Sequence, residues 1–342
     1  MRFLITGATG FLGRHLHAAL QAAGHESVAL ARDPEKAALR LPGARIVGWN
    51  GNVGLPPVEA FDGVHAVVNL IGESVAGRWT EKRKRAVRDS RILPTRALVE
   101  RMEGLTVRPR VLISMSGAAV YGDRGDAILT ESSLLGTTDG FLVRLAGEWE
   151  AAARGAEALG ARVVILRGGV VLGRDGGILK KLLLPFRMGL GGRLGDGKQY
   201  FPWIHVADAV GIVLHAAGHD ELAGPVNLVA PEPVTNTEFT DQLARALGGT
   251  ARLAVPAFAL KLALGEMAEE MLLAGQRMSP ARALQSGYVF RFPLLQDALG
   301  DILIAGKPGK GEGDGTGEGE GEGEGEGEGK AKAAAVSPSS AP

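Results

Sequence analysis

The sequence begins MRFLITGATGFLG, residues 1–13, and this stretch decides the fold. The apolar segment from Arg2 to Thr6 predicts a short strand, and the glycines Gly7, Gly10 and Gly13 follow it as a turn. Gly7 permits a tight turn, Gly10 lets the backbone approach a pyrophosphate, and Gly13 permits close packing of the next helix against the strand. The turn is therefore predicted to bind a dinucleotide phosphate at the amino end of a helix.

The residues after the turn have the spacing of a helix followed by a strand. Phe11, Leu12 and Leu16 recur at helical intervals, Gly24 ends the pattern, and residues 27–31 (SVALA) indicate a second strand. Phe11 and Leu12, together with the three glycines, are expected to bind the cofactor. A glycine-rich turn without a ligand is the alternative.

The composition bounds the class of protein. The chain has 342 residues, of which 45% are hydrophobic, and its 38 basic residues balance its 38 acidic residues. This balance argues against nucleic acid or an anionic membrane as a partner. No cysteine is present, which excludes disulfides and thiolate chemistry, and the histidines are scattered, so no metal site is predicted. The first strand starts at residue 2 and no apolar run has membrane-spanning length, so we expect a cytoplasmic protein.

Strand and helix patterns alternate through the first half of the chain, which indicates parallel strands joined by crossover helices. Their apolar runs are continuous, as expected for strands covered on both faces. We expect an α/β fold with a Rossmann-type doubly wound parallel sheet, a smaller C-terminal α/β lobe and a disordered tail. Further strands are predicted at residues 45–49, 66–70, 111–115 and 162–167, with long helices at residues 80–103 and 142–159.

Changes in composition and in residue pattern divide the chain into three parts. Residues 1–235 are predicted to form the NADP-binding Rossmann domain, with residues 171–207 contributing to the substrate lobe. Residues 236–304, which are richer in helical patterns, are predicted to form a small C-terminal domain. Residues 305–342 are low-complexity and rich in Gly and Glu, and they cannot bury enough apolar area to offset the entropy of ordering, so a disordered tail is expected.

The end of the second strand decides the cofactor, because it meets the adenosine ribose. An acid at this position binds a free 2′-hydroxyl, whereas an arginine accommodates a 2′-phosphate. Arg32 stands here and Lys36 follows it, which favours NADP(H) over NAD(H). Asp33 complicates this interpretation, although Asp33 before Pro34 also has the pattern of a helix cap.

A second turn, NLIGE at residues 69–73, follows the fourth predicted strand. In a dinucleotide-binding fold this strand end lies beside the adenosine and its ribose. Leu70, Gly72 and Glu73 are therefore expected to bind the cofactor. A glycine that simply ends a strand is the alternative for Gly72.

Several motifs together resemble the extended short-chain dehydrogenase/reductase superfamily: the glycine turn, VVNLIGES, ISMSGAAVYG and ILRGGVVLG. Longer stretches, among them RWTEKRKRAVRDSRI, GEWEAAA and QRMSPARALQSGYVFRFP, resemble the YfcH-like branch of the epimerase family. The resemblance covers residues 1 to about 304. It implies an NADP(H)-binding Rossmann domain with a small C-terminal domain of unassigned function, and it connects some members with cell division, but it names no reaction.

The superfamily's usual catalytic pair is missing. Its members use a tyrosine whose acidity is raised by a lysine four residues later, a spacing that puts both side chains on one helix face. No Tyr-x-x-x-Lys occurs in this sequence, and Phe141 and Leu145 stand where the superfamily has its pair. Ser116 and Tyr121 are the predicted catalytic residues in their place, with pocket lining or support as the alternative. Further substitutes are Ser114, Arg144 and Glu148.

Three other segments carry candidate residues. His205 and Asp208 match the superfamily's His-Val-x-Asp stretch, in which the aspartate more often caps a helix than does chemistry. Arg193, in a glycine-rich loop, is a candidate to bind an anionic group of a substrate. Gly168 and Gly169, at the end of the sixth strand, are expected to face the nicotinamide.

The leading hypothesis is an NADP(H)-dependent oxidoreductase or epimerase-like enzyme of atypical chemistry that acts on a small polar substrate. Hydride transfer needs a correctly placed cofactor and carbonyl, so a weak or water-relayed acid can complete it. The rival hypothesis is a non-catalytic regulatory or binding protein that senses NADP(H), which the missing Tyr and Lys favour. A sugar-nucleotide epimerase of ordinary mechanism is the third. The sequence leaves the substrate and the oligomeric state open.

Overall fold

The expected parallel sheet is present and has seven strands, all of them parallel. This computed structural model describes residues 1–136 and 140–304. The predicted tail at residues 305–342 lies outside the described residues. In spatial order the strands are β12 (Gly224–Leu228), β7 (Arg162–Gly168), β5 (Val111–Gly117), β4 (Ala66–Asn69), β1 (Arg2–Thr6), β2 (Glu26–Ala31) and β3 (Arg45–Gly48).

The strand order reverses at β1, which has β2 on one side and β4 on the other. Thr6, the last residue of β1, pairs with Asn69 of β4, which in turn pairs with Ser114 of β5. Open α/β sheets bind ligands outside the carboxyl ends of the strands at such a reversal. The fold therefore points to the segments that follow Thr6 and Asn69.

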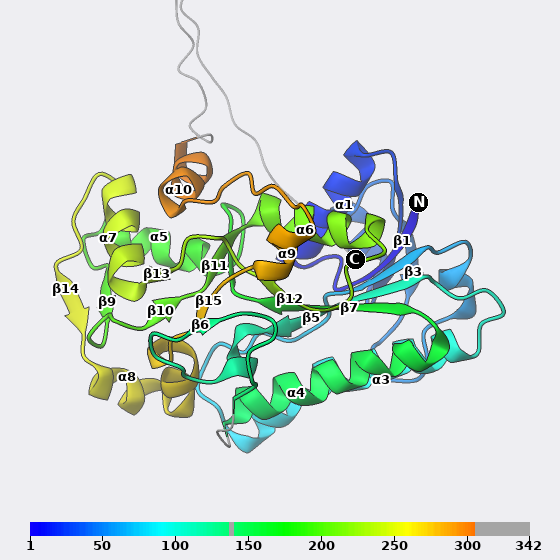
Figure 1. The fold of residues 1–342 in the computed structure, drawn as a ribbon, viewed down its shortest axis with the longest axis horizontal. Helices are drawn as coiled ribbons and strands as arrows, with labels where there is room; N and C mark the ends of the chain where they lie inside the picture. The colour runs from blue at the N-terminus through cyan, green and yellow to red at the C-terminus, as the bar shows by residue number, and fades with distance from the viewer. Residues whose placement is uncertain (137–139, 305–342) are drawn as a thin grey trace, which may run out of the picture. The chain divides into compact units, whose positions relative to one another are not determined.

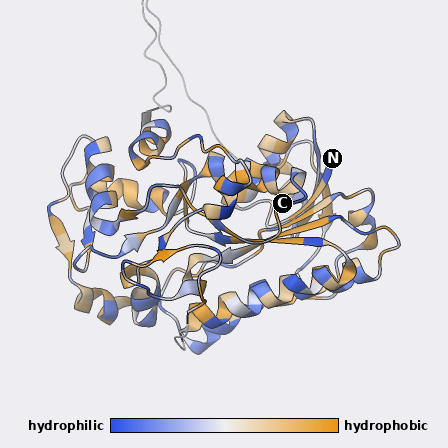
Figure 2. Ribbon diagram, in the orientation of Figure 1, coloured by the Kyte–Doolittle hydropathy of each residue, from blue (hydrophilic) through white to orange (hydrophobic). Residues whose placement is uncertain are grey.

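Helices cover both faces of the sheet (Figure 1). Successive side chains of a strand point to opposite faces, so Phe3 and Ile5 of β1 pack into one core while Leu4 packs into the other. Figure 2 shows hydrophobic colours along the sheet strands and alternating colours along the helices. The helices on one face are α1 (Phe11–Ala22) and α6 (Val206–Gly218), those on the other are α3 (Glu81–Glu103) and α4 (Phe141–Arg154), and α2 (Pro34–Arg40) joins β2 to β3.

A smaller set of elements follows β7 and has its own core, in which Leu172, Trp203, Phe239 and Leu299 are buried together. Its strands are short and pair in twos: β8 (Val170–Leu172) with β11 (Trp203–His205), β9 (Gly192–Leu194) with β14 (Leu253–Val255), and β10 (Tyr200–Phe201) with β13 (Val234–Thr235). One further pair, β6 (Ile128–Leu129) with β15 (Arg277–Met278), joins this part to the first half. The helices are α5 (Leu179–Arg187), α7 (Asn236–Ala246), α8 (Ala257–Leu264), the π-helical turn η4 (Ala268–Leu273), α9 (Ala281–Gln285) and α10 (Leu295–Ile304).

The expected helix over residues 142–159 ends earlier than predicted. Its α-helical part stops at Arg154 and continues as a 3₁₀ segment, η3 (Gly155–Leu159), before Gly160 turns the chain with a φ of 78°. Helix ends often tighten in this way when a left-handed glycine follows. Two other 3₁₀ turns are η1 (Val58–Phe61) and η2 (Ala118–Tyr121).

The role expected for Asp208 also needs correction. The N-cap of α6 is His205, whose Nδ1 accepts a hydrogen bond from the Ala207 backbone N–H at 3.1 Å. Asp208 is fully buried in the first turn of the helix, and its carboxylate accepts from the backbone N–H groups of Arg291 and Phe292 at 2.8 and 2.9 Å. Asp208 therefore fixes the segment before α10 rather than capping α6. In the described ranges no helix is long and apolar enough to cross a membrane.

Candidate functional site

The turn after β1 has the geometry that its glycines predict. Gly7 has a φ of 65°, and a Cβ on it would lie 2.7 Å from the carbonyl oxygen of Leu70. A Cβ on Gly13 would lie 2.5 Å from the carbonyl oxygen of Gly7 and 2.6 Å from Cα of Ala8. The helix and both strand ends can approach this closely because side chains are missing at these two positions.

The amino end of α1 is open to a ligand. Gly10 is its N-cap, is exposed, and in the described part of the chain no side chain accepts from the N–H groups of the first turn. Such free N–H groups and the helix dipole favour an anion. The residues present therefore fit a dinucleotide phosphate, which the backbone N–H groups of Phe11, Leu12 and Gly13 would hold. The N–H of Gly10 already donates to the carbonyl oxygen of Gly7 at 2.9 Å, so Gly10 contributes by letting the phosphate approach the backbone.

The side chain of Phe11 packs away from this turn. Its ring lies against three glycines of the loop after β8, where a Cβ on Gly173 or Gly176 would come within 2.6 or 2.4 Å of it. Asp175 in the same loop bonds Arg14 and His15 of α1 at 3.0 and 2.8 Å. Phe11 and Asp175 thus tie the start of α1 to the loop, and only the backbone of Phe11 is available to a phosphate.

Arg32 directly follows β2 and is exposed, as a residue that meets an adenosine ribose should be. Asp33 caps α2, since its carboxylate accepts from the Lys36 N–H at 3.1 Å, as expected from the Asp-Pro pattern. Lys36 is held by the same carboxylate at 2.7 Å. Asp33 is therefore engaged with its own helix and with Lys36. Arg32 is then the candidate at this strand end to contact the adenosine ribose and its 2′ substituent.

The turn after β4 supports an arginine of α3. Gly72 lies against the guanidinium of Arg91, because a Cβ on Gly72 would be 3.0 Å from its Cζ. The same guanidinium lies 5.3 Å from the ring centre of Trp149 and donates to the backbone oxygen of Glu73 at 2.8 Å. The Glu73 carboxylate pairs with Arg83. The missing side chain of Gly72 lets the Arg91 guanidinium lie against the turn. Leu70 contacts Gly7 through its backbone.

A chain of buried hydrogen bonds crosses the carboxyl ends of the strands. The Thr6 hydroxyl donates to Oδ1 of Asn69 at 2.7 Å, and Nδ2 of Asn69 donates to Thr95 and Ser114 at 2.8 and 3.1 Å. The indole N–H of Trp149 donates to the same Thr95 hydroxyl at 3.0 Å. This network connects the glycine turn to the wall of a cavity and includes Ser114, which was a candidate for chemistry.

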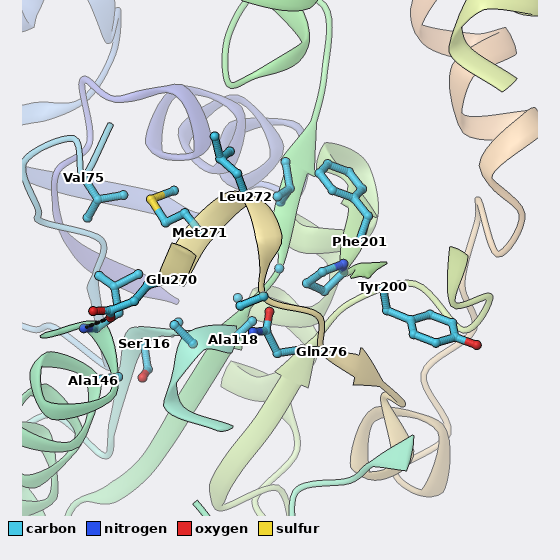
Figure 3. Close-up of a pocket in the computed structure, with 18 of the residues that line it drawn as sticks. Val75, Ser116, Ala118, Ala146, Tyr200, Phe201, Glu270, Met271, Leu272 and Gln276 are labelled. Atoms are coloured by element: carbon cyan, nitrogen blue, oxygen red, sulfur yellow. Dashed lines mark hydrogen bonds between the residues drawn. The ribbon is translucent and has the colours of Figure 1, made fainter. Parts of the chain in front are cut away.

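The cavity lies where β5 and β7 end and has a volume of about 320 Å³ (Figure 3). Ser116 and the turn after it form one wall, and Met271 and Leu272 of η4 come from the other side. Gly168 and Gly169, expected beside a nicotinamide, line it. The glycine turn, the strand reversal and this cavity therefore follow the same edge of the sheet.

Ser116 is the predicted catalytic residue that the structure places at the cavity. It is 4% exposed and its hydroxyl donates to Oε1 of Glu150 at 3.0 Å. Glu150 in turn accepts two hydrogen bonds of 2.9 Å from Arg167, a pair whose side chains are 5% and 4% exposed. Burial opposes the charge of Arg167, but its bonds to Glu150 raise its pKa above the ordinary value. Glu150 thus accepts hydrogen bonds from both Arg167 and Ser116, and it orients the Ser116 hydroxyl.

Tyr121 lies behind this ion pair and does not line the cavity. Its hydroxyl donates to Oδ1 of Asn227 at 2.7 Å and accepts from Arg167 at 3.0 Å. Burial raises the pKa of Tyr121, so its phenol keeps its proton. Phe141 is buried on α4, and Leu145 on the same helix lines the cavity, so this helix brings no acid or base to the positions of the missing pair.

The remaining candidates lie outside the cavity wall. Arg193 is exposed, while its neighbour Leu194 is part of the wall. Glu148 pairs with Arg88 at 2.9 Å, and Arg144 lies on α4 outside the wall. None of these side chains is in position to contact a molecule in the cavity.

Sequence reasoning missed two charged residues of the wall, Arg91 and Glu270. Arg91 ends a basic run at residues 81–91, whose acidic neighbours and amphipathic spacing predict a solvated helix face rather than a nucleic-acid patch. Its spacing from Val87 and Thr95, both fully buried, places it on the inward face of α3 and was a usable signal. Burial lowers the pKa of Arg91 to about 10. Glu270 carried no local signal, because its partners lie about 130 residues earlier on α4.

Residues 3–229 match the NAD dependent epimerase/dehydratase family, and residues 255–302 match a domain of unknown function, DUF1731. The chain belongs to the epimerase/dehydratase family. The family resemblance expected from the motifs is thereby confirmed.

Relatives of this epimerase family resemble the chain over nearly their whole length. Epimerase family protein Mb2239 of Mycobacterium bovis is 40% identical over 86% of this chain and 95% of its own length. Epimerase family protein SDR39U1 of Homo sapiens is 38% identical over 89% of this chain and 100% of its own length. A crystal structure of human SDR39U1 with NADPH matches with a TM-score of 0.78 and 37% identity, covering 89% of this chain and 99% of that one.

A second family structure, the nucleoside-diphosphate sugar epimerase of Corynebacterium glutamicum, has a TM-score of 0.71 and 35% identity, covering 89% of this chain and 58% of that one. These matches confirm the Rossmann-type fold that the sequence predicted. They name no reaction for the epimerase family protein described here.

Proposed function

We propose that this protein is an NADP(H)-dependent oxidoreductase of the epimerase family that acts on a carbonyl or alcohol group held in the cavity. The observation that carries the proposal is the continuity of the glycine turn at α1, the strand reversal at β1 and the cavity at the ends of β5 and β7. The NADPH in the human SDR39U1 structure supports the choice of cofactor. Arg32 supports it independently, since a guanidinium suits a 2′-phosphate.

In this proposal the protein holds the cofactor through backbone N–H groups and through the charge of one arginine side chain. The first turn of α1 binds the pyrophosphate, Arg32 binds the 2′-phosphate, and the turn containing Leu70 borders the adenosine ribose. A bound nicotinamide would supply hydride to a carbonyl carbon, or accept it from an alcohol carbon. Gly168 and Gly169 line the cavity where it would lie.

Ser116 is proposed to contact the reacting oxygen of the substrate. Its hydroxyl can turn from Glu150 to donate a hydrogen bond to that oxygen, and Glu150 then holds the site's negative charge against Arg167. The proton that the oxygen needs on reduction comes from water. This weaker acid replaces the missing tyrosine, and we therefore expect slow turnover. A cytoplasmic location, where NADPH is available, belongs to the same proposal.

One observation favours a second candidate, a non-catalytic NADP(H) sensor. Phe141 and Leu145 are apolar where the superfamily has its acid and base, so a bound cofactor would meet no strong proton donor on α4. The sensor and the enzyme share the same cofactor site and differ only in turnover.

The experiment is a titration of the purified full-length chain with NADPH and with NADH, followed by the fluorescence of the reduced nicotinamide. Tighter binding of NADPH is expected. Preference for NADH would contradict the assignment of Arg32, and failure to bind either would overturn both candidates. A screen of carbonyl compounds that follows NADPH absorbance then separates enzyme from sensor, because only the enzyme consumes NADPH.

A further inference from the structure

The cavity is walled mainly by apolar side chains, which include Leu142, Leu145, Trp149, Phe201 and Met271. Figure 3 shows the labelled apolar residues from η4 and from the turn after β5 on facing sides. A sugar presents a hydroxyl on nearly every carbon and needs a partner for each. The polar side chains of the wall therefore decide whether a sugar fits.

Two polar side chains of the wall already serve the protein itself. Nε2 of Gln199 donates to the backbone oxygens of Leu194 and Leu272 at 3.1 and 2.8 Å. Oδ1 of Asn236 accepts from the Leu194 N–H at 2.8 Å. These bonds hold the loop of β9 and η4 in place, so breaking them to bind a substrate would loosen the wall.

The acid of the wall is engaged in the same way. Both carboxylate oxygens of Glu270 accept backbone N–H groups at the start of α4, from Phe141 at 2.9 Å and Leu142 at 2.7 Å. Nε2 of Gln276 donates to the backbone oxygen of Gly122 at 3.1 Å. In Figure 3 the Tyr200 hydroxyl points away from Ser116. Glu270 and Gln276, like Gln199 and Asn236, therefore already make hydrogen bonds within the protein.

The single cation of the described wall is Arg91. It makes three hydrogen bonds within the protein, to Val87, Ser90 and Glu73, and a guanidinium has five N–H donors. At most two donors remain, and Gly72 and Trp149 both lie against the group. A diphosphate is usually recognised by several cations or by a free helix amino end. The described wall has one cation, and the Glu270 carboxylate already occupies the amino end of α4.

We propose that this cavity binds a carbonyl compound with a compact apolar body, such as an aromatic aldehyde or a cyclic ketone, and excludes nucleoside-diphosphate sugars. The proposal rests on the proposed function and specifies its substrate class, which the sequence had suggested to be polar. Ser116 supplies the one hydrogen bond that a carbonyl oxygen needs, and the apolar wall takes the rest of the molecule. The volume of about 320 Å³ suits a small ligand, since pockets for drug-sized ligands span about 300–1,000 Å³.

The test measures binding by calorimetry for benzaldehyde, cyclohexanone and acetophenone on one side and UDP-glucose on the other. Each titration of the full-length chain is run with saturating NADP⁺ and again without it. We expect at least one carbonyl compound to bind and UDP-glucose to give no heat of binding. Binding of UDP-glucose, or of none of the three carbonyl compounds, would overturn the proposal.

A pair of variants locates the binding. Ala146 is buried at the cavity on α4, and Ala151 is exposed on the same helix. Ala146→Leu fills the cavity and should weaken binding of the carbonyl compound at least tenfold, while Ala151→Leu leaves it unchanged. Should Ala146→Leu fail to fold, Met271→Lys is the second variant, because Met271 is 38% exposed and tolerates a charge. Met271→Lys should weaken binding of the carbonyl compound by a similar factor. Unchanged binding in both Ala146→Leu and Met271→Lys would show that the compound does not bind in the cavity.

The two proposals fail in different ways. If NADP⁺ binds but UDP-glucose is the only other ligand, the proposed function survives and the substrate class is wrong. If the wild-type chain binds no nicotinamide nucleotide, the proposed function is wrong, and the titrations without NADP⁺ still decide what the cavity accepts.

Discussion

The hydroxyl of Ser116 and the carboxylate of Glu150 are joined by a hydrogen bond of 3.0 Å that connects the cavity wall to a buried ion pair. Glu150 receives this bond in addition to two from Arg167, so its charge is shared between a residue at the cavity and one behind it. The arrangement places a polar group at the end of β5 without exposing the charges that orient it. Changes to Ser116 and to residues behind it should therefore have separable effects.

Ser116→Ala should lower kcat at least tenfold on whichever carbonyl compound is reduced fastest, with the NADPH dissociation constant unchanged. The matched control is Tyr121→Phe, which removes a hydroxyl from the network behind the cavity and leaves its buried partners Asn227 and Arg167 without it. It should cost about 1–3 kcal/mol of stability without changing kcat. Steady-state kinetics and urea denaturation measure the two effects. A larger kinetic effect from Tyr121→Phe than from Ser116→Ala would reverse the assignment.

Arg167→Met should destabilise the protein by about 3–5 kcal/mol, because it leaves the buried Glu150 carboxylate without its partner. The double variant Arg167→Met with Glu150→Met removes both charges and should recover much of the loss. Urea unfolding of the two single variants and the double variant gives the coupling. Strictly additive losses would show that the two residues do not act as a pair.

Gly13→Ala should displace the start of α1, because the added Cβ meets the backbone of Gly7 and Ala8 at 2.5 and 2.6 Å. A cost of about 1–3 kcal/mol is typical of overpacking, and NADPH binding should weaken with it. Gly147→Ala is the control, since Gly147 lies inside α4 with nothing within 4 Å of an added Cβ. That change should stabilise the helix by about 0.5–1 kcal/mol.

Arg32→Ala should weaken NADPH binding about 10- to 100-fold and leave NADH binding nearly unchanged, because charge-assisted hydrogen bonds contribute about 1.5–3 kcal/mol. Arg40→Ala, an exposed residue at the end of α2, is the control for the loss of one positive charge. Fluorescence titrations of both variants with both nucleotides give the comparison. Equal losses for NADPH and NADH would contradict a role in reading the 2′-phosphate.

His205 makes stability depend on pH. Burial lowers its pKa below the usual 6.5, although Asp301 opposes this shift. The unfolded chain then binds a proton that the folded chain does not, so stability should fall as the pH drops below about 6.5, by up to about 1.4 kcal/mol per pH unit. His205→Asn keeps a capping residue on α6 and removes the titration, so its stability should fall less between pH 7 and 5. Parallel curves would exclude His205 as the cause; His65 and His215, whose pKa values are also lowered, remain in both proteins.

The sheet and the cofactor turn were predictable because their signals are local. The apolar run before Gly7, the helical spacing after it and the Asp33-Pro34 cap each depend on neighbours within a few residues. The inward position of Arg91 was readable from its spacing to Val87. It was missed because residues 81–91 were interpreted together as one solvated face, although the spacing places Arg91 beside the apolar Val87.

The second half was less predictable because its short strands depend on distant partners. Arg277 of β15 pairs with Ile128 of β6, and Leu253 of β14 pairs with Gly192 of β9. Strands of two or three residues carry no period of their own. The capping of α6 by His205 was missed for a different reason, since the acidic neighbour Asp208 has the more typical capping side chain.

The bonds from Glu270 to the start of α4 have a consequence for synthesis on the ribosome. Two backbone N–H groups of α4 and one side of the cavity depend on residues that are made about 130 positions later. The parallel sheet can form as the chain leaves the ribosome. The cavity beside Ser116 stays incomplete until residues up to Gln276 have been added. A nascent chain would therefore meet its nucleotide before it could enclose any second molecule.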